Sequence, residues 1–536
     1  MDRIEFRVDG DGNVTPYPEE AKRALRAFIE AGFMGASFAA ADGGLQLPMT
    51  ITSAANLVFG AASLGAHGPA MLTTAAAHLL AAFGDDEQRE RWMTPLIEGR
   101  YFGTMALSEP QAGSSLAEIT TRAEPAGDGT YRLFGSKMWI SGSEHDLPEN
   151  IVNLVLAKIP GGPPGVKGIS LFIVPKWLVD EHGTRARNDV VVTGINHKLG
   201  QRGIINTVLT FGDRGACVGY LIGKPHDGMR QMFHMMNEAR VAIGAGAAAL
   251  SLAAYEYALH YAKDRPQGRL PSSKDPSNPP VAIVEHPDVR RMLLRQKAIA
   301  EGSLAIVLYC AHLVDVQTAP RSDEERARAS LLLDVLTPIA KTWPSERGVE
   351  STSLAIQVMG GYGYATDYPV ERIFRDQRLN PIHEGTTGIQ GLDLLGRKMR
   401  MQDGAGLRVF VATLDDEIAA AQGDAELAPL ASALADARDR LVRVTRTLLD
   451  AQATLGADRA LAEATPYLDA FGTIAVGARW LAMARAARTH ADEEFAAGKL
   501  AAARYFFREL VADANVTLDR LAQLDDTVFT VRPSML

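Results

Sequence analysis

The sequence has few cysteines, no excess of positive charge and no long uninterrupted apolar run. Its two cysteines, Cys217 and Cys310, are too few for a disulfide framework and too far apart for a metal-ligand motif, so we expect a protein of the reducing cytoplasm. Residues Met1–Arg7 carry charges where a signal peptide has its apolar core. No later stretch offers about 18 uninterrupted apolar residues, so we predict neither export nor membrane insertion.

The composition is that of a globular protein with several domains. The 536 residues are 47% hydrophobic and 22% charged, which excludes wholesale disorder. Because 64 Asp+Glu stand against 55 Lys+Arg, the formal net charge is −9. An acidic balance argues against non-specific nucleic-acid binding.

Helical and β-type patterns alternate along the chain and predict four domains. Residues 1–100 show helical periodicity, whereas residues 101–224 show short β-rich runs separated by Gly, Pro, Asn and Asp. Residues 225–400 and 401–536 are again helical. The predicted fold is α+β and multidomain: a helical N-terminal domain, a small β-barrel-like middle domain, a four-helix-bundle-like domain and an additional C-terminal helical domain.

Both C-terminal domains have long helical stretches. In the third domain we expect helices at 229–265, 289–316, 324–357 and 388–401. The last domain has four stretches that could close as an up-and-down bundle, at 407–422, 427–455, 464–490 and 498–524.

Four segments combine small and polar residues where a loop or strand could approach a ligand: Leu107–Ser115 (LSEPQAGSS), Lys137–Ser141 (KMWIS), Gln357–Gly363 (QVMGGYG) and His383–Gln390 (HEGTTGIQ). Trp139 offers a flat apolar wall, and glycines at a helix end allow the backbone to approach a pyrophosphate. Each segment alone also has a structural explanation, namely a turn, a core tryptophan, a helix cap or a solvated glutamate.

In this order and spacing the four segments resemble the motifs of the acyl-CoA dehydrogenases, and the resemblance covers residues 20–400. Residues 143–152, 274–292 and 391–398 look most like the large branch that includes methylmercaptopropionyl-CoA dehydrogenase and carries an extra C-terminal helical domain. Ser115 stands where the family pattern usually has Asp. Because the branch usually has helices before the segment at Tyr17, the N-terminal domain is expected to lack its first helices.

The resemblance implies an FAD site shared by the β-domain and the helical domain. The β-domain would contribute Met105, Leu107, Ser108, Ser114, Trp139, Ile140 and Ser141. The helical domain would contribute Arg265, Gln267, His286, Gln357, Gly360, Gly361, Thr386 and Gln390, in part to a flavin held mainly by the neighbouring subunit. Pro287 replaces the Gln that often follows the residue matching His286.

The resemblance also implies that Glu384 is the base that removes the α-proton of the substrate. Burial against ligand and flavin should raise the pKa of this carboxyl. Ser114, Asn237, Arg240 and Gly385 would contact the substrate, although Asn237 replaces the usual Asp. A surface or salt-bridged helix arginine is the alternative interpretation of Arg240.

The expected function is FAD-dependent dehydrogenation of an acyl-CoA to the trans-2-enoyl-CoA in fatty acid β-oxidation. Electrons would pass to an electron-transfer flavoprotein, and the enzyme would be a cytoplasmic homodimer with no metal, nucleic acid or membrane partner. The motifs do not separate this function from that of an acyl-CoA oxidase, which uses O₂. A catalytically silent scaffold would not need Glu384.

A DNA-associated flavoprotein of the same fold is the rival from another class. Residues 401–536 contain 14 Lys+Arg and 20 Asp+Glu, a net charge of −6. That sign is wrong for binding phosphates.

Overall fold

The computed structural model describes residues 2–9, 12–180, 182–273 and 275–536, without the side chains of residues 234–237. The chain forms two compact units. Unit 1 contains residues 1–52 and 62–239, and unit 2 contains residues 53–61 and 240–536. Helices α2 (Met49–Phe83) and α5 (Gly228–Asp264) contribute residues to both units.

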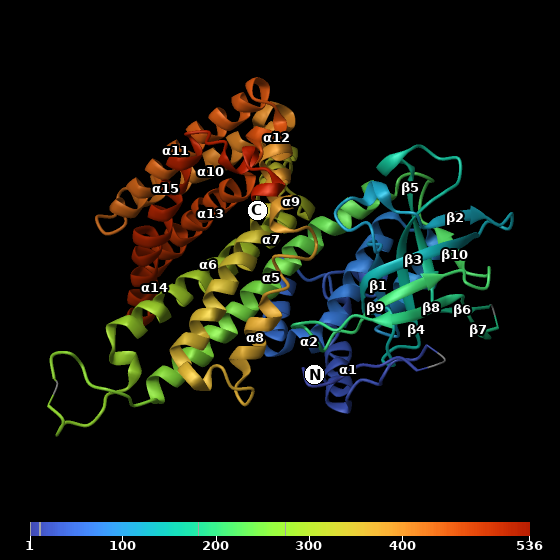
Figure 1. The fold of residues 1–536 in the computed structure, drawn as a ribbon, viewed down its shortest axis with the longest axis horizontal. Coiled ribbons are helices and arrows are strands. Elements are labelled where there is room, and N and C mark those ends of the chain that lie inside the picture. Colours follow the sequence, from blue (N-terminus) through green and yellow to red (C-terminus); the bar gives the residue numbers. More distant parts are fainter. Residues whose placement is uncertain (1, 10–11, 181, 274) are drawn as a thin grey trace. The chain divides into compact units, whose positions relative to one another are not determined.

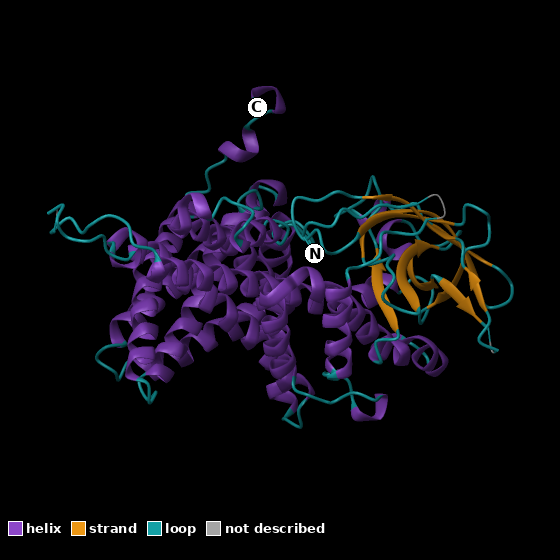
Figure 2. Ribbon diagram, turned by 90° about the horizontal axis from the view of Figure 1, so that it is seen from below, coloured by secondary structure: helices purple, strands orange, loops and turns teal. Residues whose placement is uncertain are grey.

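Unit 1 begins with helices and continues into a sheet that curves on itself (Figure 2). The strand order is β1-β4-β5-β10-β3-β9-β8, with β2 paired to β3 and β4. The strands are β1 (Tyr101–Ala106), β2 (Arg122–Pro125), β3 (Tyr131–Ser141), β4 (Asn150–Lys158), β5 (Ile169–Pro175), β8 (Val190–Ile195), β9 (Asn206–Phe211) and β10 (Val218–Leu221). The β1–β4 pair is parallel, and a second sheet pairs β6 (Trp177–Val179) with β7 (Arg185–Arg187).

The central strands β4 and β5 are buried along almost their whole length and are rich in Ile, Val and Leu. Such continuous apolar strands need cover on both faces. One core cluster of unit 1 joins residues of these strands to Leu79, Trp92 and Leu96, which lie in the N-terminal helical region. That region contains α1 (Glu19–Glu30), most of α2, α3 (Asp86–Gln88) and α4 (Thr94–Ile97).

Unit 2 is helical throughout (Figure 1). After α5 come α6 (Pro287–Thr318), α7 (Asp323–Met359), α8 (Pro369–Gln377) and α9 (Thr387–Leu392). The C-terminal helices α10 (Ala405–Ala421), α11 (Ala428–Thr454), α13 (Ala464–Ala487), α14 (Glu493–Phe506) and α15 (Ala512–Leu521) pack together. The predicted long helices are thus present, while α8 had no counterpart in the sequence analysis.

One hydrophobic core runs through α6, α7, α10, α11 and α13–α15. Two buried tryptophans tie its parts together: Trp343 Nε1 donates to Thr473 Oγ1 at 3.1 Å, and Trp480 Nε1 donates to the Ala298 carbonyl at 3.1 Å. One hydrophobic core therefore continues across the domain boundary that the sequence predicts at residue 400.

Three helices are long and apolar enough to cross a membrane by length and composition alone, namely α2, α5 and α6. Within the structure, 28%, 56% and 50% of their apolar windows are buried. The expectation of no membrane insertion rested on the lack of a long uninterrupted apolar run in the sequence, and it stays a prediction.

Candidate active site

Glu384 lies on the loop between α8 and α9, in a backbone conformation that is uncommon for a non-glycine residue. Its φ is +52°, and that of the following Gly385 is +86°. A Cβ on Gly385 would lie 2.6 Å from the Gln390 amide nitrogen, which itself donates to the Glu384 carbonyl at 3.1 Å. Positive φ at a non-glycine residue persists only where the surroundings enforce it. The loop thus holds Glu384 in a defined, strained position.

Arg240 of α5 is the principal cation near this loop. It is 3% exposed, and its Nη1 lies 3.3 Å from the Asp393 carboxylate, which also binds Arg397 at 2.6 Å. Burial lowers the pKa of Arg240, while Asp393 and Glu384 act to raise it. Arg240 is therefore a buried, salt-bridged residue that also interacts electrostatically with Glu384, and not a surface arginine.

Burial raises the pKa of the half-buried Glu384 carboxyl above its ordinary value. The charges of Arg240 and Lys341 act in the opposite direction. Within the described ranges, the backbone N–H of Glu384 donates no hydrogen bond to another backbone group or side chain. A basic carboxylate and a free N–H donor therefore share one residue, an arrangement suited to removing a proton next to a carbonyl.

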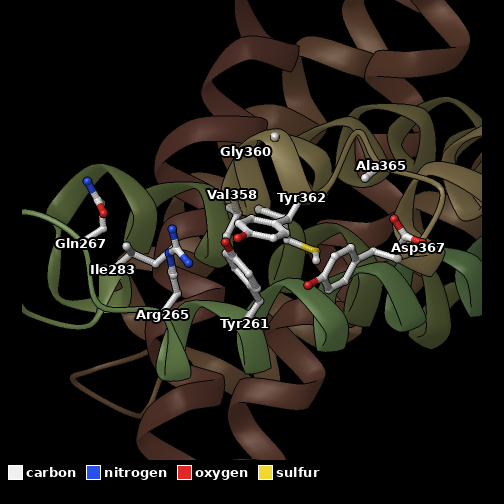
Figure 3. Close-up of a pocket in the computed structure, with 12 residues that line it drawn as sticks. Tyr261, Arg265, Gln267, Ile283, Val358, Gly360, Tyr362, Ala365 and Asp367 are labelled. Carbon is white, nitrogen blue, oxygen red and sulfur yellow. The ribbon is translucent and has the colours of Figure 1, made fainter.

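A second site of unit 2 is a cavity of about 740 Å³ beyond the C-terminus of α7. Predicted residues Arg265, Gln267, Gly360 and Gly361 line it. Figure 3 shows Arg265 pointing toward Tyr362, and its guanidinium lies 5.2 Å from the centre of that ring. A guanidinium can bind phosphate oxygens, aromatic rings can stack on a base, and glycines leave the backbone accessible, so the cavity suits a nucleotide with a pyrophosphate.

The glycines of this cavity leave space where side chains would stand. Gly360, with φ +60°, caps α7, and a Cβ on it or on Gly361 would meet nothing within 4 Å. The segment can therefore approach a ligand with its backbone.

The β-domain site lies where the loop after β1 meets β3. The Met138 N–H donates to the Ser108 carbonyl at 2.9 Å, and Lys137 Nζ donates to the Leu107 carbonyl at 2.9 Å. Trp139 has φ +67° within the irregular stretch of β3 where its register with β9 shifts, and its side chain is 57% exposed. A bulky residue held at positive φ with its ring toward solvent is a genuine outlier and indicates a surface prepared for a ligand.

The other residues predicted to bind cofactor or substrate differ in exposure. Met105 and Ile140 are buried in the cores of unit 1, so their side chains are unavailable to a ligand. Ser141 Oγ accepts from Asn206 Nδ2 at 3.0 Å, and His286 Nε2 lies 2.8 Å from the Gln267 carbonyl. Ser114, Gln357 and Thr386 are exposed, and the side chain of Asn237 lies outside the described residues.

Sequence reasoning missed three features of these sites. They are the buried Lys341, the pairing of Arg240 with Asp393, and the aromatic group Tyr261, Tyr362 and Tyr368 at the cavity. Lys341 stands among apolar residues of α7 (TPIAKTWP, 337–344), and a cation in an apolar run could have been a signal. The other two depend on contacts between distant segments.

The residues fit FAD, the cofactor that this fold implies. The glycine-bounded cavity offers space and a cation, while Trp139 offers an exposed aromatic face. Each unit offers its own residues that could contact it: Leu107, Ser108, Trp139 and Ser141 in unit 1, and Arg265, Gln267, Gly360 and Gly361 in unit 2.

Family models match almost the whole chain. Those described as the N-terminal, middle and C-terminal domains of acyl-CoA dehydrogenase match residues 9–100, 104–213 and 226–399. A further model, described as acetyl-CoA dehydrogenase C-terminal like, matches residues 410–532.

Two curated relatives are similar over nearly their full lengths. The chain is 38% identical to a 3-methylmercaptopropionyl-CoA dehydrogenase of Ruegeria pomeroyi, over 96% of this chain and 87% of that protein. It is 34% identical to the broad-specificity linear acyl-CoA dehydrogenase FadE5 of Mycobacterium tuberculosis, over 98% of this chain and 90% of that one.

Solved structures share the fold. An acyl-CoA dehydrogenase of Bacillus anthracis complexed with FAD has a TM-score of 0.78 and 22% identity, covering 96% of this chain and 84% of its own. ACDH-11 of Caenorhabditis elegans in complex with C11-CoA has a TM-score of 0.77 and 20% identity, covering 93% and 80%.

The chain belongs to the acyl-CoA dehydrogenase family. It is an FAD-dependent enzyme that dehydrogenates acyl-CoA, in the branch with an additional C-terminal helical region. The predictions of family, fold class, enzyme class and cofactor are confirmed.

Proposed function

We propose that Glu384 removes the α-proton of an acyl-CoA thioester and that the product is the trans-2-enoyl-CoA. The observation that carries the proposal is the basic, half-buried Glu384 carboxylate on its strained loop, with Arg240 and Lys341 interacting electrostatically. A thioester α-C–H is only weakly acidic, so the base must be stronger than a solvated carboxylate. Desolvation supplies that increase.

The reaction needs two groups of this loop. The Glu384 carboxylate takes the α-proton, while its backbone N–H donates to the thioester oxygen, on which negative charge develops. As the α-proton and the β-hydride leave, the Cα–Cβ double bond forms. When bound, FAD supplies the acceptor for the β-hydride. The charges of Arg240 and Lys341 act against the rise in the Glu384 pKa that burial causes.

The electron acceptor after this step is proposed to be an electron-transfer flavoprotein. Anaerobic titration of the purified enzyme with a panel of acyl-CoAs, followed by flavin absorbance, tests the dehydrogenation and identifies the acyl chain that bleaches the flavin. Turnover with a dye acceptor is then compared with peroxide yield in air. High peroxide yield would identify an oxidase, and an unbleached flavin with every acyl-CoA would overturn the proposed function.

We expect a homodimer with about one FAD per chain, because the cavity at Arg265 and Gly360 opens on the surface of unit 2 and would receive the flavin of a neighbouring subunit. The additional C-terminal helices of this chain would cover the face that smaller relatives use to pair two dimers into a tetramer. Light scattering of the yellow protein measures the mass. A monodisperse FAD-loaded monomer would contradict this expectation.

Changing Arg265 to Glu should weaken FAD retention. The substitution replaces the cation beside Tyr362 with an anion, which repels a pyrophosphate. We expect at least a tenfold loss of bound FAD, about 1.4 kcal/mol, measured as the ratio of flavin to protein absorbance after gel filtration. Arg508→Glu makes the same charge change at an exposed position of unit 2 and should retain FAD like the parent.

A further inference from the structure

Lys341 differs from the other buried lysines of the described chain. Lys137 lies 2.9 Å from Glu109, and Lys398 lies 2.5 Å from Asp334. Lys341 is fully buried, and its Nζ has no hydrogen-bond partner among the described residues. Burying an ammonium without a hydrogen bond is costly. The cation therefore needs an explanation other than stability.

The position of Lys341 is set by a close crossing of α5 and α7. Pro344 has no N–H to offer the Ala340 carbonyl one turn earlier. Gly244 of α5 lies at this carbonyl, since a Cβ on Gly244 would stand 1.9 Å from the carbonyl oxygen and 3.4 Å from the backbone nitrogen of Lys341. Arg240 precedes Gly244 by one turn of α5 and so lies on the same side of that helix. The crossing thus brings Lys341 and Arg240 to one region of unit 2.

Three charged groups act on Lys341. They are Glu346 of its own helix, Glu384 of the α8–α9 loop, and Arg240 of α5. Glu346 is exposed and accepts a hydrogen bond from the Thr387 hydroxyl, so solvent screens its charge. Burial lowers the pKa of Lys341 to about 8, which leaves it charged at neutral pH.

The other charges of this region are already paired. Asp393 forms ion pairs with both Arg240 and Arg397. The two charged groups that lower the pKa of Glu384 are Arg240 and Lys341. Arg240 therefore divides its charge between Asp393 and Glu384, whereas no carboxylate of the described residues is hydrogen-bonded to Lys341. Lys341 is thus a second cation acting on Glu384, after Arg240, and it has no hydrogen-bonded carboxylate of its own among the described residues.

We propose that Lys341 is a positioning residue for the base. The buried crossing of α5 and α7 holds its ammonium in place, and the ammonium keeps Glu384 ionised and so sets the pH at which this enzyme removes the α-proton. The inference rests on the proposed role of Glu384 as the base. Lys341 itself neither accepts the proton nor contacts the reacting atoms. It acts through Glu384 alone.

The test compares Lys341→Met and Lys341→Gln, which remove the charge, with Lys341→Arg, which keeps it. Lys398→Met removes another buried lysine of unit 2 that is paired with Asp334, and it serves as the matched control. Since Lys341 has no hydrogen bond to lose within the described structure, the unfolding temperatures of the two neutral variants should not fall below that of the parent.

The first readout needs no turnover. Infrared difference spectra across pH follow the carbonyl band of protonated glutamic acid, and the band that disappears in Glu384→Gln is that of Glu384. An opposite charge at close range shifts a carboxyl pKa by about one unit or more. In the neutral variants the midpoint of this band should therefore rise by about one pH unit or more, while Lys341→Arg and Lys398→Met keep the parent midpoint.

The second readout is stopped-flow reduction of the flavin by acyl-CoA. Below the midpoint the neutral variants should reduce their flavin about tenfold more slowly for each pH unit by which the midpoint has risen, and raising the pH should restore the rate. A merely structural role for Lys341 would lower the rate at every pH. An unchanged infrared midpoint in both neutral variants, or a loss that alkaline pH does not restore, would overturn the inference.

The two proposals fail separately. If Glu384→Gln stops flavin reduction but the neutral variants keep the parent midpoint, Glu384 is the base and the role of Lys341 is wrong. If the midpoint shifts while Glu384→Gln still reduces its flavin, Lys341 controls the ionisation of Glu384 and the assignment of the base is wrong.

Discussion

Changing Glu384 to Gln is expected to stop reduction of the flavin by acyl-CoA while leaving the fold and the FAD content intact. The amide keeps the size of the side chain but cannot take a proton. General-base catalysis contributes about 10²–10⁴-fold, and we expect a loss at or above the top of that range. Asp393, the carboxylate bound to Arg240, is held by two arginines and is therefore occupied. Stopped-flow spectroscopy of the flavin measures the rate.

Binding should survive the change, which separates loss of the base from loss of the site. The backbone N–H at position 384 still donates to a thioester oxygen, so a product-like enoyl-CoA should still perturb the flavin spectrum. Glu371→Gln on α8 removes a carboxylate that pairs with Arg375 at 2.8 Å and should reduce flavin like the parent. A Glu384→Gln enzyme that reduces its flavin within tenfold of the parent rate would show that the base is another residue.

The pH profile follows from the raised pKa of Glu384. Burial disfavours the carboxylate, so the group stays protonated to a higher pH than the ordinary 4.5. The base acts only when ionised, so flavin reduction should be lost as the pH falls through the raised pKa and regained above it. A profile that declines only below about pH 4.5, the ordinary pKa of a glutamate, would contradict this assignment.

The sequence predicted the parts of the site that depend on short motifs. Gly360 was expected at the end of a helix, and it caps α7. Glu384 was expected in a loop, where it lies, and burial within the protein alone already raises the pKa of its carboxyl. These features are local, because a glycine at positive φ or a loop between two helices is encoded within a few residues.

The rest depends on contacts that no local pattern encodes. Arg240 and Asp393 are separated by about 150 positions, and their pairing requires α5 to lie beside the segment after α9. Lys341 is buried because Gly244 allows α5 to reach the backbone of α7. The same limit applies to α8, whose nine residues are too short for periodicity to distinguish them from a loop.

The Glu109–Lys137 pair holds together the part of the β-domain whose residues we expect to contact the flavin. Both side chains are almost fully buried, and the Glu109 carboxylate accepts hydrogen bonds from the backbone N–H groups of Thr120 and Thr121 at 2.7 and 3.0 Å. Lys137 also binds the Leu107 carbonyl, so one ammonium fixes the loop after β1 to β3. Burial acts to raise the pKa of Glu109, but Lys137 and the threonine hydrogen bonds lower it to about 2.

The depressed pKa of Glu109 makes the stability of the region around β1 and β3 depend on pH in the acid range. The pair stabilises the fold fully above the ordinary glutamate pKa of 4.5, and the contribution is lost as the pH falls toward 2. Hydrogen exchange of peptides from β1 and β3 should therefore accelerate across that window in the parent.

Changing Lys137 to Met should destabilise this region at neutral pH as well, because it leaves the Glu109 carboxylate buried without its cation. Breaking a buried ion pair in this way costs about 3–5 kcal/mol. Local opening measured by hydrogen exchange of residues 101–141 isolates the effect from the unfolding of unit 2. Lys158→Met, which removes a partly exposed ammonium bound to the Ala117 carbonyl, is the control and should cost about 1 kcal/mol.

The double variant Lys137→Met/Glu109→Gln decides whether the cost comes from an unpaired charge. A neutral amide needs no cation, so most of the lost protection should return even though both charged groups are gone. If the double variant opens as readily as Lys137→Met, the lysine acts through its hydrogen bond to Leu107 and not through its charge. FAD retention should fall in Lys137→Met and recover in the double variant to the same extent as the protection from exchange. The reason is that the Lys137 ammonium also holds the loop that carries Leu107 and Ser108.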